Sequence, residues 1–248
     1  MGQHQALVTG AGRNVGQGIA LALAEAGYAV AVNDLHAQRA AQTVELIKGT
    51  GGTARAAVFD VTDSAEVRAV TAELGDIDIL VNNAGISEAF RQGPFLESAP
   101  QDWHVQFDLN LFGPMTLIHA LLPGMVARRW GRVVQISSGA AARGLNIGVS
   151  LYAASKAGIE GLLRHVANEV ASSGVTVNAL ELGMMDNTIE AAGGPGSPGA
   201  RKIVAGIPVG RAGLPSDVGG ATSWLCSEAG GWVTGQVIHL NGGAYNGR

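Results

Sequence analysis

The 248-residue sequence contains a single cysteine and few charged side chains, and these shortages exclude several classes of protein. Cys226 has no second thiol to pair with, so an internal disulfide framework or a thiolate metal cluster cannot form. The six histidines show no metal-ligand spacing. We therefore expect no metal site and a reducing, cytoplasmic compartment. The net charge of −4 provides no broad cationic surface for nucleic acid or for an anionic membrane.

Long uncharged runs are also missing, because residues such as Glu25, Glu45 and Glu169 interrupt the alanine-rich stretches. The first residues lead into an expected strand without a basic and apolar leader pattern. Hydrophobic residues, in contrast, make up 47% of the chain, which is enough to bury a large core. We expect one domain over residues 1–248 that is soluble and acts on a small molecule.

Short β-branched runs alternate with longer segments of helical period along the whole chain. This alternation predicts an α/β fold with a Rossmann-like, doubly wound, seven-stranded parallel sheet and helices on both faces. The expected strands cover residues 6–9, 29–33, 54–59, 77–82, 132–137, 175–180 and 236–240. The expected helices cover residues 16–26, 37–48, 64–73, 101–128, 152–173 and 215–227.

Glycine and proline dominate residues 191–199, which read AAGGPGSPG and predict a loop after the sixth strand. Ligands of open α/β sheets bind beyond the carboxyl ends of the strands. A long segment in that place can close over a substrate, so we expect a substrate lid at residues 184–207. A surface excursion without a ligand role is the simpler alternative.

A glycine-rich turn follows the first expected strand and opens a helix, with Gly10, Arg13 and Gly16 among its residues. Its backbone N–H groups and the helix N-terminus can bind a pyrophosphate, although such glycines can also serve packing alone. Asp34 closes the second strand, where a carboxylate binds ribose hydroxyls and repels a 2′-phosphate. Asp34 therefore favours NAD, whereas Arg13 could pair with the phosphate of NADP or form only a surface ion pair. NAD is our preferred cofactor and NADP is the alternative.

Tyr152 and Lys156 are one helical turn apart and share a helix face. A phenol has a pKa near 10, and a neighbouring ammonium favours its charged form, so the pair suits proton exchange near neutral pH. Ser138 ends the fifth strand, on the same sheet edge as the glycine turn, and can orient a substrate oxygen. A surface helical pair and a loop-capping serine are the structural alternatives.

Together these motifs resemble the short, single-domain branch of the short-chain dehydrogenase/reductase family over essentially the whole chain. Residues 9–16 resemble its TGxxxGxG turn, residues 82–85 its NNAG, and residues 152–156 its YxxxK. The resemblance implies hydride transfer between a nicotinamide dinucleotide and a secondary alcohol or ketone, with Tyr152 exchanging the proton. It also implies that Lys156 binds the nicotinamide ribose and lowers the pKa of the phenol.

The resemblance assigns further residues to the site. Asn110, in DLNLFG, would hold a water that links the lysine to solvent. The implied catalytic residues are Asn110, Ser138, Tyr152 and Lys156. The implied cofactor residues are Gly10, Arg13, Asn14, Val15, Gly16, Asp34, Leu35, Asp60, Val61, Asn83, Ala84, Gly85, Tyr152, Lys156, Gly183, Met185 and Thr188.

Two places depart from the family pattern. Asn14 replaces the middle glycine of the turn, and asparagine tolerates the left-handed backbone geometry that such a turn requires. Leu182 and Gly183 replace the usual Pro-Gly after the sixth strand, and Asn187 precedes Thr188, which affects the expected contacts to the carboxamide.

Three functions compete: an NAD(P)-dependent dehydrogenase of a secondary alcohol, an NADPH-dependent 3-oxoacyl-[acyl-carrier-protein] reductase, and a non-catalytic dinucleotide-binding protein. Arg128, Arg129 and Arg132 either complement a helix dipole or dock an acidic carrier protein. The substrate pocket would be lined by mostly apolar residues, which suggests a largely uncharged substrate; its segments are residues 86–95, 143–151 and 184–207. The resemblance implies a homotetramer or homodimer that uses the two long helices and the final strand.

Overall fold

The computed structural model describes residues 3–86 and 92–245, in which seven strands form one parallel sheet. The strand order is β3-β2-β1-β4-β5-β6-β7, so the order reverses between β1 and β4, as in a doubly wound fold. The predicted fold class is confirmed. The strands are β1 (Gln5–Val8), β2 (Ala29–Asp34), β3 (Ala54–Val58), β4 (Ile79–Asn82), β5 (Gly131–Ser138), β6 (Val175–Leu182) and β7 (Val237–Leu240).

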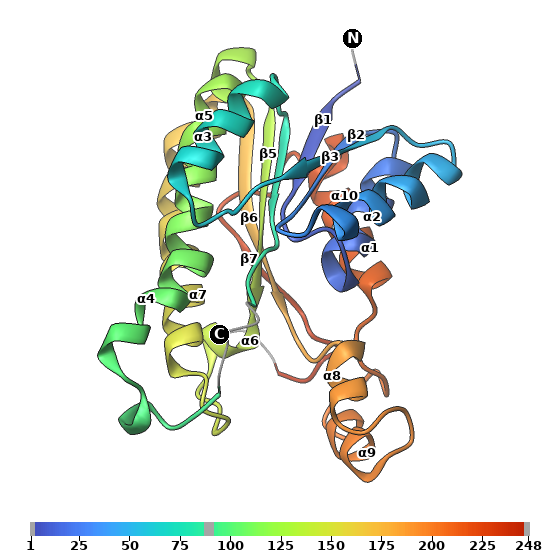
Figure 1. The fold of residues 1–248 in the computed structure, drawn as a ribbon, viewed down its shortest axis with the longest axis vertical. Helices are drawn as coiled ribbons and strands as arrows, with labels where there is room; N and C mark the ends of the chain where they lie inside the picture. Colours follow the sequence, from blue (N-terminus) through green and yellow to red (C-terminus); the bar gives the residue numbers. More distant parts are fainter. Residues whose placement is uncertain (1–2, 87–91, 246–248) are drawn as a thin grey trace.

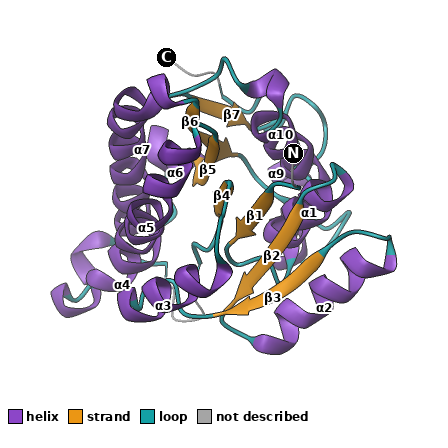
Figure 2. Ribbon diagram, turned by 90° about the horizontal axis from the view of Figure 1, so that it is seen from above, coloured by secondary structure: helices purple, strands orange, loops and turns teal. Residues whose placement is uncertain are grey.

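Helices cover both faces of the sheet, with α3, α5 and α7 on one side and α1, α2 and α10 on the other (Figures 1 and 2). The two longest elements of the first layer, α5 and α7, lie along β4, β5 and β6. The layer helices are α1 (Asn14–Glu25), α2 (Ala37–Gly49), α3 (Ser64–Leu74), α5 (Gly113–Arg128), α7 (Ser150–Val170) and α10 (Pro215–Cys226). The shorter helices are α4 (His104–Phe107), α6 (Gly139–Ala142), α8 (Asp186–Ala191) and α9 (Pro198–Val204).

The helix predicted over residues 101–128 is interrupted. A 3₁₀ turn at Pro100–Asp102 precedes α4, and a π-helical turn at Asp108–Phe112 separates α4 from α5. The sequence did not predict the π turn, because this local change in hydrogen bonding depends on how the segment packs. Pro100–Arg128 has the length and composition to cross a membrane, but Leu117, Ile118 and Met125 of this segment pack into the core.

Residues 192–197, most of the segment predicted as a loop, form turns and bends that connect the two short helices α8 and α9. Ser197 caps α9 by accepting a hydrogen bond from the Ala200 N–H at 3.0 Å, and Pro198 occupies the first helical turn. Ile189 on α8 and Ala200 on α9 form a small apolar cluster with Ala212. The expected lid segment thus has a small apolar cluster of its own, and Figure 1 shows α8 and α9 projecting below the sheet.

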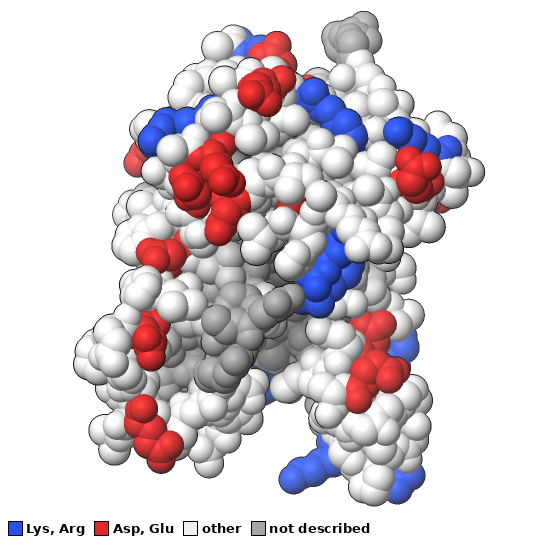
Figure 3. Space-filling view, in the orientation of Figure 1, with Lys and Arg blue, Asp and Glu red and all other residues white. Residues whose placement is uncertain are grey.

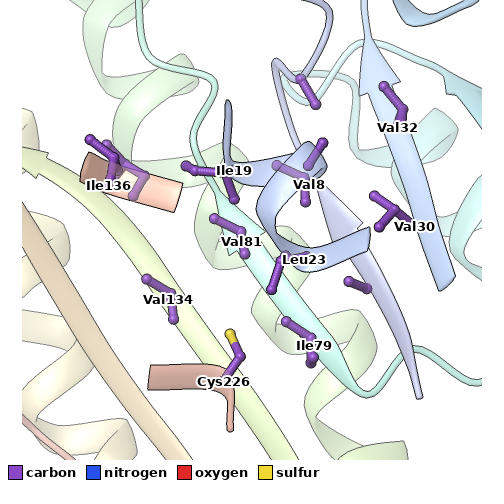
Figure 4. Close-up of a cluster of buried hydrophobic side chains, with 14 of the residues drawn as sticks. Val8, Ile19, Leu23, Val30, Val32, Ile79, Val81, Val134, Ile136 and Cys226 are labelled. Carbon is purple, nitrogen blue, oxygen red and sulfur yellow. The ribbon is translucent and has the colours of Figure 1, made fainter. Parts of the chain in front are cut away.

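The core fills the space between the sheet and each helical layer. Figure 4 shows one half of it, where Val8, Val81 and Val134 from the central strands face Ile19 and Leu23 of α1. These strands are buried on both faces, which explains their continuous apolar runs. Because all seven strands run in the same direction, their carboxyl ends meet at one edge of the sheet, where the polar residues gather.

Candidate active site

A cavity of about 490 Å³ opens at the carboxyl ends of the strands, a size that suits a cofactor and a small substrate. One end is formed by the glycine turn after β1 and the end of β2. The other end is formed by the segments that follow β5 and β6. The predicted site residues that line it are Gly10, Arg13, Asn14, Val15, Gly16, Asp34, Asn83, Ala84, Gly85, Ser138, Tyr152, Lys156, Gly183, Met185 and Thr188.

The glycine turn has the geometry of an anion cradle. Asn14 adopts a left-handed φ of 48°, as its replacement of glycine requires. A Cβ atom on Gly16 would lie 2.2 Å from the Gly10 carbonyl oxygen, so only glycine allows this close approach. The first turn of α1 contains no acidic residue, and Arg13 makes no side-chain cap. Asn14, Val15 and Gly16 line the cavity, so the positive end of the α1 dipole lies at its wall.

Asp34 is fixed beside this turn. Its carboxylate accepts hydrogen bonds from the Gly12 N–H at 3.2 Å and the His36 N–H at 2.9 Å, and its exposed fraction is 7%. Arg39, near the start of α2, lines the same end of the cavity. The sequence analysis did not single out Arg39, although a basic residue closely following the expected ribose reader was an available signal. The turn, the helix N-terminus and the carboxylate fit a dinucleotide.

Asn83 connects the glycine turn to the end of β4. Its Nδ2 atom donates to the carbonyls of Thr9 at 2.9 Å and Gly10 at 3.1 Å, which holds the turn in place. Ala84 and Gly85 continue along the cavity wall.

Three predicted cofactor residues lie outside the cavity lining. Leu35 is 61% exposed, and Val61 is buried in the core. Asp60 accepts hydrogen bonds from the N–H and hydroxyl of Thr62, both at 2.8 Å, so its carboxylate organises the turn before α3.

The reacting end is formed by Ser138 and Tyr152. Ser138 caps α6 by accepting from the Ala140 N–H at 3.3 Å, and its side chain neighbours the Tyr152 phenol in the cavity lining. Burial raises the pKa of Tyr152, and the hydrogen bond from Ser138 opposes that rise. The nucleotide-binding and reacting groups therefore share one cavity.

Lys156 lies on the same face of α7, with Nζ 5.7 Å from the centre of the Tyr152 ring. Nζ donates to the Ile136 carbonyl at 2.8 Å. Burial lowers the pKa of Lys156 to about 8, and the carboxylate of Glu160 opposes that effect. The predicted lowering of the phenol pKa by the ammonium does not dominate in this structure, because both groups are buried and burial disfavours both charged forms.

Asn110 is fully buried in the π-helical turn, outside the cavity lining. Its Nδ2 atom donates to the Gln106 carbonyl at 3.1 Å, whereas its Oδ1 atom has no donor among residues 3–86 and 92–245. A Cβ atom on Gly85 would lie 2.9 Å from that oxygen and 3.0 Å from Lys156 Nζ. Both atoms therefore approach the same glycine, and the unpaired acceptor is suited to an ordered water.

The segment after β6 forms the wall next to the lid. Gly183 has no room for a side chain, because a Cβ atom would lie 2.8 Å from Asn241 Cα. Met185 pairs with Gly213 in an isolated parallel bridge, which anchors the start of α8. Thr188 lies half-buried on α8 and faces the cavity, although the sequence departs from the family pattern here.

Two lining residues have no assigned role in the sequence analysis: Arg143 was predicted only as part of the pocket segment 143–151, and Tyr245 was not predicted at all. Tyr245 is far from every motif, and its hydroxyl donates to Glu181 Oε1 at 2.7 Å. No local pattern in the sequence signals such a contact between segments so distant along the chain. Residues 87–91 of the predicted pocket segment 86–95 lie outside the described residues.

Only part of the predicted basic group at Arg128, Arg129 and Arg132 is available at the surface, where Arg129 is exposed. Arg128 is paired with Asp76 at 2.7 Å and Asp78 at 3.1 Å. Arg132 is only 3% exposed, and its guanidinium lies 4.4 Å from the Trp130 ring centre. In the view of Figure 3, acidic and basic side chains are interspersed rather than gathered into one basic field.

Comparison with known proteins agrees with this geometry. A family model described as enoyl-(acyl carrier protein) reductase matches residues 10–245. The protein is 38% identical over 245 residues to a Staphylococcus aureus protein named 3-oxoacyl-[acyl-carrier-protein] reductase FabG, covering 97% of each chain.

Solved structures are similar over nearly the full length. A gluconate 5-dehydrogenase from Burkholderia cenocepacia in complex with NADP and tartrate has a TM-score of 0.88 at 33% identity, covering 98% of this chain and 96% of that one. A 3-oxoacyl-[acyl-carrier protein] reductase with bound NAD from Brucella melitensis has a TM-score of 0.87 at 34% identity, covering 97% and 90%. The chain belongs to the short-chain dehydrogenase/reductase family, whose members act on CH–OH groups with NAD(P), and is an oxidoreductase.

Proposed function

We propose that this protein interconverts a secondary alcohol and a ketone, with Tyr152 as the general acid and base. The observation that carries the proposal is that Ser138 and the Tyr152 phenol are neighbours in the cavity that also contains the glycine turn. Serine and phenol thereby face one oxygen atom of a substrate, within reach of a cofactor bound at the turn.

In the oxidative direction, the phenolate form of Tyr152 accepts the proton of the substrate hydroxyl. Ser138 donates a hydrogen bond that orients the same oxygen. A bound oxidised nicotinamide would accept the hydride from the carbon, so that the C–H bond breaks as the C=O bond forms. Lys156 keeps positive charge near the phenolate when it is protonated, and Asn110 Oδ1 holds the water through which the proton leaves toward solvent. Reduction reverses each of these steps.

NAD is the proposed cofactor, because Asp34 is held by two backbone N–H groups at the end of β2. A carboxylate there accepts from ribose hydroxyls and repels a 2′-phosphate. NADP is the alternative, supported by the two arginines at this end of the cavity, Arg13 and Arg39.

The test uses wild type and Tyr152→Phe with NAD(H) and NADP(H) against a panel of secondary alcohols and their ketones. We expect absorbance change at the nicotinamide band with wild type alone, while both proteins bind the reduced cofactor equally well in a fluorescence titration. A panel without turnover, or a variant as active as wild type, would reject the proposed reaction.

Reduction of a 3-oxoacyl thioester is the second candidate, favoured by the name of the Staphylococcus aureus relative. The N-acetylcysteamine thioester of 3-oxobutanoate, tested with NADPH, separates the two. Rapid reduction of this thioester, with slow oxidation of simple secondary alcohols, would select the carrier-linked activity. The ion pairs of Arg128 and the burial of Arg132 weaken the argument for a docked carrier protein, although Arg129 remains exposed.

We further propose that residues 1–248 form one cytoplasmic domain that assembles into a homotetramer or homodimer. Apolar side chains remain exposed where such contacts would form: Phe112 beside α5 is 52% exposed and Trp232 before the edge strand β7 is 98% exposed. Light scattering of the purified protein gives the mass directly, and a monomer would contradict the assembly.

A further inference from the structure

Arg143 is attached to the reacting serine through a single turn of helix. Its N–H donates to the Gly139 carbonyl at 3.3 Å, and Ser138 caps the other end of α6. Four helical residues advance about 6 Å, so Arg143 is held at a short distance from the oxygen-binding group. Its side chain lines the cavity together with Tyr152.

The guanidinium of Arg143 rests on an aromatic platform. It lies 4.1 Å from the centre of the Tyr245 ring, a cation–π contact that leaves the edge of the guanidinium and its N–H groups available. Within residues 3–86 and 92–245, no carboxylate forms an ion pair with Arg143, in contrast to Arg128 and Arg211, which each have an aspartate partner.

Tyr245 is itself held in place by two hydrogen bonds. The Tyr245 hydroxyl donates to Glu181 Oε1 at 2.7 Å, and Asn241 Nδ2 donates to the Tyr245 carbonyl at 2.8 Å. Glu181, on β6, is 1% exposed and also contacts His239 Nδ1 at 2.7 Å. Burying a carboxylate is costly unless it is hydrogen-bonded, and Glu181 has two such partners. Its hydrogen bond with the Tyr245 hydroxyl holds the ring in one orientation.

The other basic side chains of the described cavity lining lie away from the wall next to Arg143 or are hydrogen-bonded elsewhere. Lys156 donates to the Ile136 carbonyl, and Arg13 and Arg39 lie at the glycine-turn end. Around Arg143 the wall is apolar, with Leu145, Ile147 and Val149 from the same segment. An arginine fork on an apolar wall is suited to bidentate binding of a carboxylate.

We propose that Arg143, positioned by Tyr245 and Glu181, binds a carboxylate of the substrate, so that the alcohol oxidised by this protein is a short hydroxy acid. The proposal rests on the proposed function and specifies its substrate class. It replaces the largely uncharged substrate that the apolar composition of the pocket segments suggested, because composition does not show where one cation lies.

The experiment compares hydroxy acids of three to six carbons with their primary amides, which have nearly the same size and no charge. We expect wild type to prefer the acids at least tenfold in kcat/KM. Arg143→Gln should lower kcat/KM for the acids about 10- to 100-fold, mainly through KM, and leave the amides within twofold. Arg143→Lys should recover part of the loss, since it restores the charge without the fork.

Two further variants separate specific from general effects. Arg68→Gln removes an exposed arginine of α3 far from the cavity lining and should change neither series. Tyr245→Phe keeps the ring but loses the bond to Glu181, and should raise KM for the acids by a few-fold without changing kcat for the amides.

The outcomes distinguish the two levels of the proposal. Amides used as well as acids, or an acid-to-amide ratio unchanged in Arg143→Gln, would overturn the carboxylate site and leave the alcohol dehydrogenase standing. Turnover of neither series with either cofactor would overturn the proposed function itself. A preference for the 3-oxobutanoate thioester over the hydroxy acids would overturn the carboxylate site at Arg143.

Discussion

The two ends of the cavity are built in different ways. At the glycine-turn end, backbone N–H groups, the start of α1 and one carboxylate, Asp34, provide the polar groups, all within the first two strands and their connections. At the other end, side chains from β5, α7 and the C-terminal segment converge, and Arg143 and Tyr245 meet from positions far apart in the sequence. Backbone groups bind what all cofactors of one kind share, whereas converging side chains select individual substrates.

Tyr152→Phe should give the largest difference between the two ends of the cavity, because it affects turnover and not cofactor binding. We expect turnover to fall by about a hundredfold to ten-thousandfold, the usual contribution of a general acid or base, because the phenol hydroxyl is the proton donor and acceptor. Affinity for the reduced cofactor should stay within twofold, since the glycine turn is untouched. Initial rates and a fluorescence titration measure the two quantities, and parallel losses in both would mean that the ends are not independent.

Lys156→Met tests the buried charge between the two ends. The pKa of Lys156 is about 8 in the folded protein against 10.5 for a free lysine, so between these values the unfolded chain binds a proton that the folded chain lacks. The stability of wild type relative to Lys156→Met should therefore rise as the pH increases from 8 to 10.5, by up to about 3 kcal/mol.

Urea unfolding of both proteins at several pH values measures that difference. Lys48→Met is the matched control, because it makes the same substitution at an exposed position on α2. A constant difference for Lys156→Met would show that the amine is not desolvated as the structure indicates.

Asp34→Asn should change the cofactor end alone. Loss of the carboxylate removes the repulsion of a 2′-phosphate, so we expect the preference for NAD over NADP in kcat/KM to fall about 10- to 100-fold, or roughly 1.4–2.8 kcal/mol. Glu45→Gln removes an exposed carboxylate of α2 outside the cavity lining and serves as the control. If both variants keep the wild-type ratio, Asp34 does not read the ribose.

The smallest effect is expected from Asn14→Ala. Asn14 has a φ of 48°, which alanine adopts at a cost of about 1 kcal/mol, whereas Asn14→Gly relieves that restriction. Denaturant midpoints should therefore place Asn14→Ala below wild type and leave Asn14→Gly close to it. Equal midpoints for the two variants would remove the conformational argument for this position.

Much of the fold could be predicted because its causes are local. Buried parallel strands such as β1 and β2 contain short continuous apolar runs, and helices such as α2 begin and end within one residue of the prediction. The π-helical turn at Asp108–Phe112 and the two helices of the lid were not predicted, because both depend on how the segment packs rather than on its period.

The site divides in the same manner. The glycine turn, Asp34, Ser138, Tyr152 and Lys156 lie in sequence patterns with a fixed structural context, so their convergence on one cavity followed from the strand order. The contact between Arg143 and Tyr245 could not be predicted, because it depends on the path of the chain after β7. Whether Arg132 is exposed likewise depends on Trp130 and not on the number of neighbouring arginines.

The rate at which a thiol reagent labels the single cysteine can measure local opening of the helical layer that contains it. Cys226, at the end of α10, is completely inaccessible, and burial raises the pKa of its thiol to about 12. Thiol reagents therefore cannot modify it until α10 separates from the sheet, and the rate of labelling measures how often that layer detaches. Because α10 packs on α1, which starts at the glycine turn, cofactor binding should slow the labelling, so one absorbance trace reports ligand binding without any turnover.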